Sequence, residues 1–406
     1  MADAGGRTIL LAALALGIAA AQPLSADEDG APKLSASSSV PRHLPAAAMD
    51  GRLETSWQSE SSGEQELRID LGAARKVGGL AVTWEPELGA GLVIVDTSDD
   101  EKEWRVLRRL YGVLGEKCWI RLPGTGGRYL RLRLTEGDGP GYGIREIDLL
   151  PAEVAGSVEA LYGVMAKDAR RGLFPRGVRG EAASWEPVGA EGDRDVAFLS
   201  ADGAFEPAGG LFLLEPFVRV AGRLVTWADV TAEPSREGGT VPTPTVTWTT
   251  REVRLDVTAS REGPPGASRV LVRYHVRNRT KGKLVATLVL AIRPLLSRPK
   301  ANAAGAAWRV ASIRTLDWDG RQVRVNDARA LIPLRSPASF NAAAFTAGDV
   351  TTYLEAGRVP PEHGAEDPAG LASGLLAFPL SLEAGAGADV AVEIPSAPGA
   401  GATKAR

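Results

Sequence analysis

The residues of this chain best suited to acid–base chemistry are carboxylates that occur in close pairs. Asp193 with Asp195, and Asp317 with Asp319, are each separated by a single residue. Hydrolysis of a glycosidic bond needs two carboxyl groups held on either side of the bond. Acids two positions apart instead flank a turn or share one face of a strand, so we expect both pairs to be solvated. No nucleophile elbow, zinc signature or phosphate-binding loop is present, and we predict no catalytic residue in this chain.

Thiol chemistry is also disfavoured by the sequence. Cys118 is the only cysteine, so no intramolecular disulfide can form. It lies in the segment KCWIRL, whose pattern is that of a strand, and we expect a buried, small apolar side chain. A catalytic thiol would need a histidine and a polar pocket, and the chain holds only His43, His275 and His363.

Short strands dominate the elements that must position any functional side chain. In the segment RYLRLRL, Leu130, Leu132 and Leu134 alternate with arginines, which is the period of a half-buried strand. The almost continuous apolar run from Leu284 to Ile292 predicts a central strand. Several short strands between Leu67 and Leu150 indicate a β-sandwich or jelly roll, and a longer series follows from about residue 174 to residue 395. The fold class is therefore mainly β.

One helix stands out between the two strand-rich regions. Val158, Leu161, Tyr162 and Met165 recur at helical spacing within residues 157–171. Basic residues near its end suit the negative pole of the helix dipole, and a glycine follows them. We expect a helical connector over residues 152–173 that packs on the second strand-rich region.

Composition bounds the partners of the chain. Its 406 residues allow two or three domains, and the net charge of −3 gives no reason to expect nucleic acid or an anionic membrane surface. Nine of the few aromatic residues are tryptophans. A tryptophan can serve as a stacking platform for a sugar ring, although filling a core is its commoner role.

The N-terminus has the pattern of a secretory signal. Arg7 precedes the apolar run from Ile9 to Ala21, which is too short to span a bilayer, and small residues recur at Ala21 and Ala26. We expect cleavage of residues 1–26 and a secreted or periplasmic protein; a buried N-terminal helix is the alternative. Residues 27–45 read as a linker and residues 396–406 as a disordered tail. The sequence shows no second apolar span.

Five segments in order resemble one known family. They are AMDGRLETSW (residues 48–57), IDLG (69–72), TSDDEKEW (97–104), RYLRLRL (128–134) and GYGIREI (141–147). Together they resemble the coagulation factor 5/8 type C, or discoidin, domain, whose fold is shared by family 32 carbohydrate-binding modules. The resemblance implies a discoidin-like jelly-roll sandwich, assigned to residues 46–151, whose role is to bind.

The resemblance also implies a structural calcium ion, which pins the loops at one end of such sandwiches. The matching positions are Asp50, Thr55 and Glu146, with backbone carbonyls near Ala47 and Leu53 completing the shell. Oxygen ligands of this kind suit a hard cation. The alternative is that Asp50 begins a turn, Thr55 is a strand residue and Glu146 is a surface charge.

Sugar-binding residues of the family lie on loops at one end of the sandwich. Matched by position, the candidates are His43 on the entry loop, Trp84 and Glu85 after the strand LAVTW, and Tyr142 just before Glu146. An aromatic platform beside a polar group is what a sugar requires. Each of these residues could equally be a surface or core residue.

The second strand-rich region resembles the N-terminal β-supersandwich of bacterial proteins that end in an (α/α)6 six-hairpin glycosidase barrel. The similar segments are ASWEPVGAEGDRDVAFLSADGAFE (residues 183–206), GRLVTWADV (222–230) and TVTW (245–248). The resemblance implies one large antiparallel supersandwich over residues 174–395. In that family the catalytic acid or base belongs to the helical barrel, which is absent from this sequence.

These inferences predict a secreted carbohydrate-binding protein, whose discoidin-type module anchors a glycosidase-type sandwich to a polysaccharide or glycan. A split or truncated glycoside hydrolase, with its separate catalytic barrel domain encoded elsewhere, is one alternative. A cell-envelope module that binds protein or lipid through apolar loop tips is another. The sequence itself does not identify the glycan.

Overall fold

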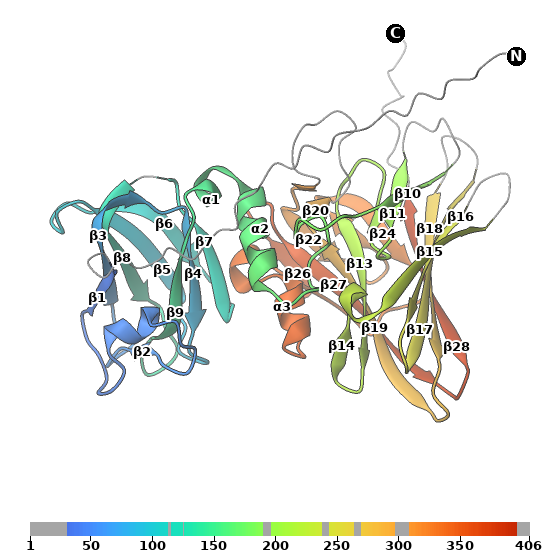
Figure 1. Cartoon of the computed structure of the whole chain (residues 1–406), viewed down its shortest axis with the longest axis horizontal. Coiled ribbons are helices and arrows are strands. Elements are labelled where there is room, and N and C mark those ends of the chain that lie inside the picture. The colour runs from blue at the N-terminus through green and yellow to red at the C-terminus, as the bar shows by residue number, and fades with distance from the viewer. Residues whose placement is uncertain are drawn as a thin grey trace, which may run out of the picture.

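The computed structural model describes residues 31–112, 115–124, 126–189, 196–237, 243–263, 269–296 and 308–395. They form two β-sandwiches with helices between them (Figure 1). The predicted signal peptide, the tail and the Asp193–Asp195 pair lie outside the described residues. No helix in the described part of the chain is long and apolar enough to cross a membrane.

The first sandwich consists of a five-stranded and a four-stranded sheet, and its paired strands run antiparallel. The five-stranded sheet has the order β1 (Lys33–Ala36), β3 (Gln65–Lys76), β8 (Gly126–Thr135), β5 (Leu92–Ser98) and β6 (Arg105–Tyr111). The four-stranded sheet has the order β2 (Trp57–Gln58), β9 (Gly143–Leu150), β4 (Gly79–Trp84) and β7 (Lys117–Arg121).

Alternation along β8 builds the core of this sandwich as the sequence predicted. Leu130, Leu132 and Leu134 are buried, and the arginines between them lie on the outer face of the sheet. Each fully buried leucine stabilises the fold by roughly 1.5–3 kcal/mol. Cys118 is buried in β7, also as expected.

The sandwich begins earlier than the sequence indicated. Lys33–Ala36, expected within a linker, forms β1 and pairs with β3 from Lys33 opposite Asp70 to Ala36 opposite Leu67. The strand has only four residues and buries none of them fully, so its hydrophobic pattern carries little signal. Its backbone hydrogen bonds, which composition does not reveal, place it in the sheet.

The two ends of the first sandwich differ in their connections. At one end, called the loop end, β3 begins at Gln65 and β6 ends at Tyr111. At the other, called the turn end, Ser98 of β5 lies opposite Tyr129 of β8. In Figure 1 the short helix η1 (Pro45–Met49) marks the loop end and α1 (Glu153–Gly156) the opposite end. The loop-end connections that the structure describes in full are residues 37–56, 59–64, 85–91 and 136–142.

The predicted connector is helical. After α1, α2 spans Val158–Asp168, and Ser157 caps its start by accepting a hydrogen bond from the backbone N–H of Ala160 at 3.1 Å. The helix ends at Asp168 because Ala169 is already extended, three residues before the glycine predicted to end it. Its buried side chains are Leu161, Tyr162, Met165 and Ala166.

The second sandwich is mainly β, as predicted. Its eight-stranded sheet has the order β10 (Trp185–Val188), β11 (Ala197–Ser200), β12 (Phe205–Glu206), β13 (Leu213–Val220), β19 (Leu284–Arg293), β27 (Ser373–Leu382) and β25 (Ser339–Ala343), with β14 (Arg223–Val225) paired to β13. Its nine-stranded sheet has the order β15 (Thr231–Glu237), β16 (Thr243–Thr249), β17 (Val253–Glu262), β18 (Arg269–Asn278), β28 (Gly387–Pro395), β24 (Ala328–Pro333), β23 (Val323–Val325), β22 (Thr315–Trp318) and β26 (Gly364–Glu366). The smaller elements are the β20 (Leu295–Leu296) and β21 (Arg309–Val310) pair, η2 (Trp227–Asp229), η3 (Phe345–Ala347) and α3 (Val350–Glu355).

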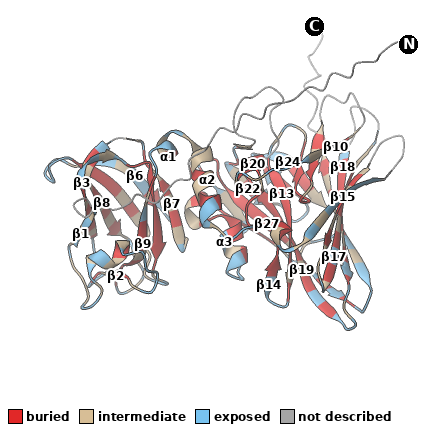
Figure 2. Ribbon diagram, in the orientation of Figure 1, coloured by how far each residue is buried: buried red, intermediate tan, exposed pale blue. Residues whose placement is uncertain are grey.

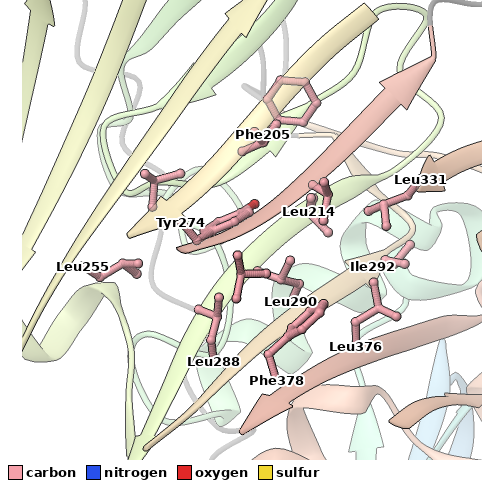
Figure 3. Close-up of a cluster of buried hydrophobic side chains, with 14 of the residues drawn as sticks. Phe205, Leu214, Leu255, Tyr274, Leu288, Leu290, Ile292, Leu331, Leu376 and Phe378 are labelled. Atoms are coloured by element: carbon pink, nitrogen blue, oxygen red, sulfur yellow. The ribbon is translucent and has the colours of Figure 1, made fainter. Parts of the chain in front are cut away.

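The core of the second sandwich lies between these two large sheets. The apolar run predicted as a central strand is β19, which lies between β13 and β27. Figure 3 shows Leu288 and Leu290 of this strand beside Phe378, with Tyr274 from the facing sheet nearby. Buried residues fill both sandwiches in Figure 2.

A third apolar cluster joins the two sandwiches through the connector. It contains Ala81 and Leu150 from the first sandwich, Val154 from α1, and Phe217 and Val289 from the second sandwich. Polar contacts add to it. Gly115 donates its N–H to the carbonyl of Thr346, Lys117 pairs with Asp168, and Glu116 pairs with Arg358.

Candidate functional site

An ion pair at the loop end links the two strands β4 and β9. Glu85 directly follows β4, and Arg145 lies on β9. The guanidinium of Arg145 donates two hydrogen bonds of 3.0 Å, one to each carboxylate oxygen of Glu85. This fork geometry holds the pKa of Glu85 below its ordinary value. Position 143 must be glycine, because a Cβ there would lie 2.6 Å from the Cβ of Glu85.

Hydrogen bonds of Ser56 connect this ion pair to the entry loop. His43 Nδ1 lies 3.1 Å from the Ser56 carbonyl oxygen and 3.2 Å from its hydroxyl. A hydrogen bond from Ser56 also lowers the pKa of Glu85. The structure therefore brings His43 and Glu85 into one group with Ser56 and Arg145, called the loop-end polar cluster. The side chains of Arg145 and Glu85 remain about a quarter exposed.

The two aromatic candidates do not belong to this surface. Trp84 is 3% exposed and Tyr142 is fully buried, and both are part of the core of the first sandwich. The prediction that they offer ring faces to a ligand is therefore wrong. Trp84 packs in this core together with Leu80 and Val82 of the same strand. The Tyr142 hydroxyl donates a 2.7 Å hydrogen bond to the carbonyl of Ser62, which braces the loop.

The apolar side chains exposed at the loop end are ones that sequence reasoning did not select. Leu44 is 60% exposed, Leu53 is 55% exposed, and Tyr111 is 63% exposed. Leu44 directly precedes η1, Leu53 follows the turn at Gly51, and Tyr111 ends the edge strand β6. Isolated apolar residues in loops carry no periodic signal, so only their exposure identifies them.

The three predicted calcium ligands lie close together. The hydroxyl of Thr55 is 2.9 and 2.8 Å from the two carboxylate oxygens of Asp50. The backbone N–H of Gly51 donates to Glu146 Oε2 at 2.9 Å. The loop that contains Asp50, Gly51 and Thr55 is thereby fastened to Glu146 of β9.

The chemistry of this donor set fits a hard cation. Burial, followed by repulsion from Asp148 and Asp50, raises the pKa of Glu146 to about 7. Among the residues that the structure describes, Glu146 has no basic partner in an ion pair. Two carboxylates and a hydroxyl meet there, but no group of three His, Cys, Asp or Glu side chains suited to a metal is found among the described residues. Any cation held here would need backbone oxygens or water as further ligands.

Of the remaining paired acids, Asp319 is held by hydrogen bonds in a turn. Asp319 accepts hydrogen bonds from the side chain and backbone of Gln322 and from the backbone of Arg321, and these lower its pKa to about 2. A carboxyl group that is ionised at nearly every pH cannot act as a general acid. Asp319 is thus a turn residue, as expected, and Asp317 lies on β22.

The comparison with known families concerns the first sandwich. Residues 33–147 match the family described as F5/8 type C domain. The first sandwich is an F5/8 type C domain. The match starts at β1, in agreement with the strand pairing that places β1 in the sheet.

Solved structures similar to the chain cover about this same third of it. A chitosan-binding module 1 of a chitosanase/glucanase from Paenibacillus sp. IK-5 is 22% identical, with a TM-score of 0.29, and covers 30% of this chain and 96% of that one. A family 32 module of Clostridium perfringens NanJ, solved with galactose, is 18% identical, with a TM-score of 0.27, and covers 29% of this chain and 92% of that one. No curated protein in the comparison matches the chain.

Proposed function

We propose that the F5/8 type C domain binds carbohydrate at its loop end. The observation that carries the proposal is the polar cluster, in which a forked Glu85–Arg145 pair connects through Ser56 to His43. Sugars offer neighbouring hydroxyl groups that donate and accept hydrogen bonds, and this cluster supplies both functions on a preorganised, partly exposed surface. The exposed Leu44, adjacent to His43, offers apolar surface for a sugar face.

A calcium ion at Asp50, Thr55 and Glu146 would serve this site by fixing the loop that follows η1. When bound, the ion supplies positive charge to the buried carboxylate of Glu146. The residues themselves already fasten the loop to β9 through the Gly51–Glu146 hydrogen bond. The role proposed for the ion is structural.

In the wider proposal, the protein is exported and its F5/8 type C domain anchors the second sandwich to a polysaccharide. The second sandwich would work beside a separate helical catalytic barrel. The signal-like pattern before Ala26 and the resemblance of the second sandwich to glycosidase supersandwiches support these two points. Sequencing the N-terminus of the mature protein tests whether the signal is cleaved. Reading the adjacent genomic sequence tests whether a helical catalytic barrel is encoded there.

The carbohydrate proposal is tested by retention of the chain on a panel of polysaccharides, with calcium and with a chelator. We expect retention on one glycan class and a loss of affinity of about tenfold or more in Glu85→Gln, because Arg145 then loses its charged partner. Glu87→Gln is the matched control, because Glu87 lies on the same loop and is exposed. Equal loss in both variants, or no retention of the parent chain, contradicts the proposal.

A second candidate function, binding to a lipid surface, is favoured by the exposure of Leu44 and Leu53. Apolar side chains projecting from loops can insert between lipid headgroups. The same preparation is therefore mixed with phosphatidylserine-containing vesicles and sedimented. Co-sedimentation that is lost in the Leu44→Ser/Leu53→Ser variant, without retention on any glycan, would favour the lipid function over the carbohydrate function.

A further inference from the structure

A hollow lies at the turn end of the F5/8 type C domain, away from the loop-end polar cluster. It has a volume of about 290 Å³ and is bordered by the β5–β6 turn and the start of β8. This volume is near the lower bound of roughly 300 Å³ for small-molecule pockets, and suits one or two sugar rings. Its lining includes Ser98, Asp99, Glu103, Trp104, Arg105 and Gly126.

The indole ring of Trp104 is held in place by three contacts. Its Nε1–H donates to the carbonyl of Glu101 at 3.0 Å. The guanidinium of Arg131 lies 4.2 Å from the ring centroid and that of Arg68 lies 5.9 Å away. Unlike Trp57, which is fully buried, Trp104 keeps part of its surface exposed. A fixed, partly exposed aromatic ring loses little entropy when a ligand stacks on it.

The turn that carries Trp104 is rigid as well. The carboxylate of Asp100 accepts the backbone N–H groups of Lys102 at 2.9 Å and Glu103 at 3.0 Å, and also the hydroxyl of Ser98. These bonds lower the pKa of Asp100 and keep it ionised. Asp100 is thus occupied in holding the turn and is unavailable to a ligand.

Two carboxylates of the turn that line the hollow remain available to a ligand. Among the residues that the structure describes, the side chains of Asp99 and Glu103 have no hydrogen-bonding or ionic partner, and both are exposed. From Asp99 to Arg105 the turn carries four acidic and two basic residues, so its charge is negative. The positive charge of Arg131 behind the ring is offset by Asp96 at 2.9 Å and Glu66 at 3.1 Å.

We propose that this hollow binds an amino sugar with a free ammonium group, such as a glucosamine residue, which stacks on Trp104 and is paired by Asp99 and Glu103. The apolar face of the sugar covers the indole, and the ammonium is attracted both to the carboxylates and to the ring face. An N-acetylated sugar lacks this charge, and a uronate carries the opposite one. The site is separate from the loop-end polar cluster, because the two lie at opposite ends of the first sandwich.

The test is calorimetric titration of the full chain with a fully deacetylated glucosamine trimer at mildly acidic pH. We expect binding that weakens about tenfold, or about 1.4 kcal/mol, in the Asp99→Asn/Glu103→Gln variant. Both substitutions preserve side-chain shape on an exposed turn, so folding is retained. Trp104→Phe, which keeps an aromatic ring, should weaken binding less than Trp104→Ala.

Three comparisons decide the proposal. Glu87→Gln, which removes an exposed carboxylate at the loop end, should leave this titration unchanged; an equal loss there would show that overall negative charge, and not Asp99 and Glu103, attracts the amino sugar, and would overturn the assignment. The N-acetylated trimer should bind much more weakly, and equal binding overturns the role of charge. Ethanolamine, an amine without a sugar ring, should not bind. If it bound as strongly as the trimer, the hollow would be a site for any cation, and the proposal of a sugar site would be overturned.

Discussion

The protonation of Glu146, at the loop end, is linked to the stability of the fold. Its pKa is raised from 4.5 to about 7, so the folded protein holds this proton more tightly than the unfolded chain does. Without a cation, the contribution of Glu146 therefore favours folding at low pH and is lost as the pH rises from 4.5 towards 7. A calcium ion bound at the proposed site would replace the proton and reverse this dependence, because calcium binds only the ionised carboxylate.

We predict that Glu146→Gln stabilises the protein in chelator above pH 7, by about 1–3 kcal/mol at 1.36 kcal/mol per pKa unit. The amide imitates the protonated acid and avoids burying a charge. The same variant should lose the stabilisation that calcium gives to the parent protein. Thermal unfolding with calcium and with chelator, above and below pH 7, measures both effects. Stabilisation of Glu146→Gln by calcium to the full parental extent would exclude Glu146 as a ligand.

The sequence located the loop end but did not reveal which of its side chains face outward. His43 and Glu85 were selected by position and lie in one polar cluster, whereas Trp84 and Tyr142 were selected by the same reasoning and lie in the core. Side chains alternate between the two faces only as far as the strand continues. The residue at which a strand ends cannot be read from residue type, so the direction of the side chains near that end cannot be read either. Arg145 was missed, because it lies at the register shift between β4 and β9, and the irregular pairing that brings it beside Glu85 leaves no signal in the sequence.

A single side chain of β19 fastens three neighbouring elements of the second sandwich. Arg293 is fully buried and donates to Glu215 of β13 at 3.0 Å, to the Leu173 carbonyl after the connector at 2.9 Å, and to Asp349 at 3.2 Å. Asp349 in turn caps α3 through the N–H of Thr351. Strand, connector and helix therefore share one buried charge network.

Removal of this arginine should destabilise the second sandwich strongly. We predict that Arg293→Met lowers its free energy of unfolding by about 3–5 kcal/mol, because the carboxylates of Glu215 and Asp349 are left buried without a cation. Urea unfolding followed by circular dichroism measures the loss. Arg273→Met, on the exposed face of β18, should stay within about 0.5 kcal/mol of the parent. A similar midpoint for the two variants would show that the network is not stabilising.

Long periodic elements were predictable and short ones were not. The strand β8 and the helix α2 were recognised because ten or eleven residues repeat one hydrophobic period, and β19 was recognised because its apolar run is almost continuous. The four-residue β1 was missed, because its membership depends on pairing with β3 across more than thirty residues of chain. Distant pairing of this kind leaves no local trace.

The two sandwiches are held together by the apolar cluster around the connector. Val154 of α1 is fully buried in this cluster, which includes residues of both sandwiches. We predict that Val154→Asp separates them, because a charge cannot remain buried there without a partner. Small-angle X-ray scattering should report a larger radius of gyration with unchanged strand content, whereas Glu153→Lys, at the exposed neighbouring position, should not. An unchanged radius in both variants would show that the polar contacts suffice.

The buried thiol of β7 allows the rate at which the F5/8 type C domain opens to be measured chemically. Cys118 is the only cysteine of the chain, and burial raises the pKa of its thiol to about 12. An alkylating reagent can therefore react only when β7 detaches from β4, so the rate of modification counts those openings. The neighbouring residues Lys117 and Trp119 contact the connector. A ligand that tightened either end of the domain would therefore be detected as slower alkylation of this natural cysteine.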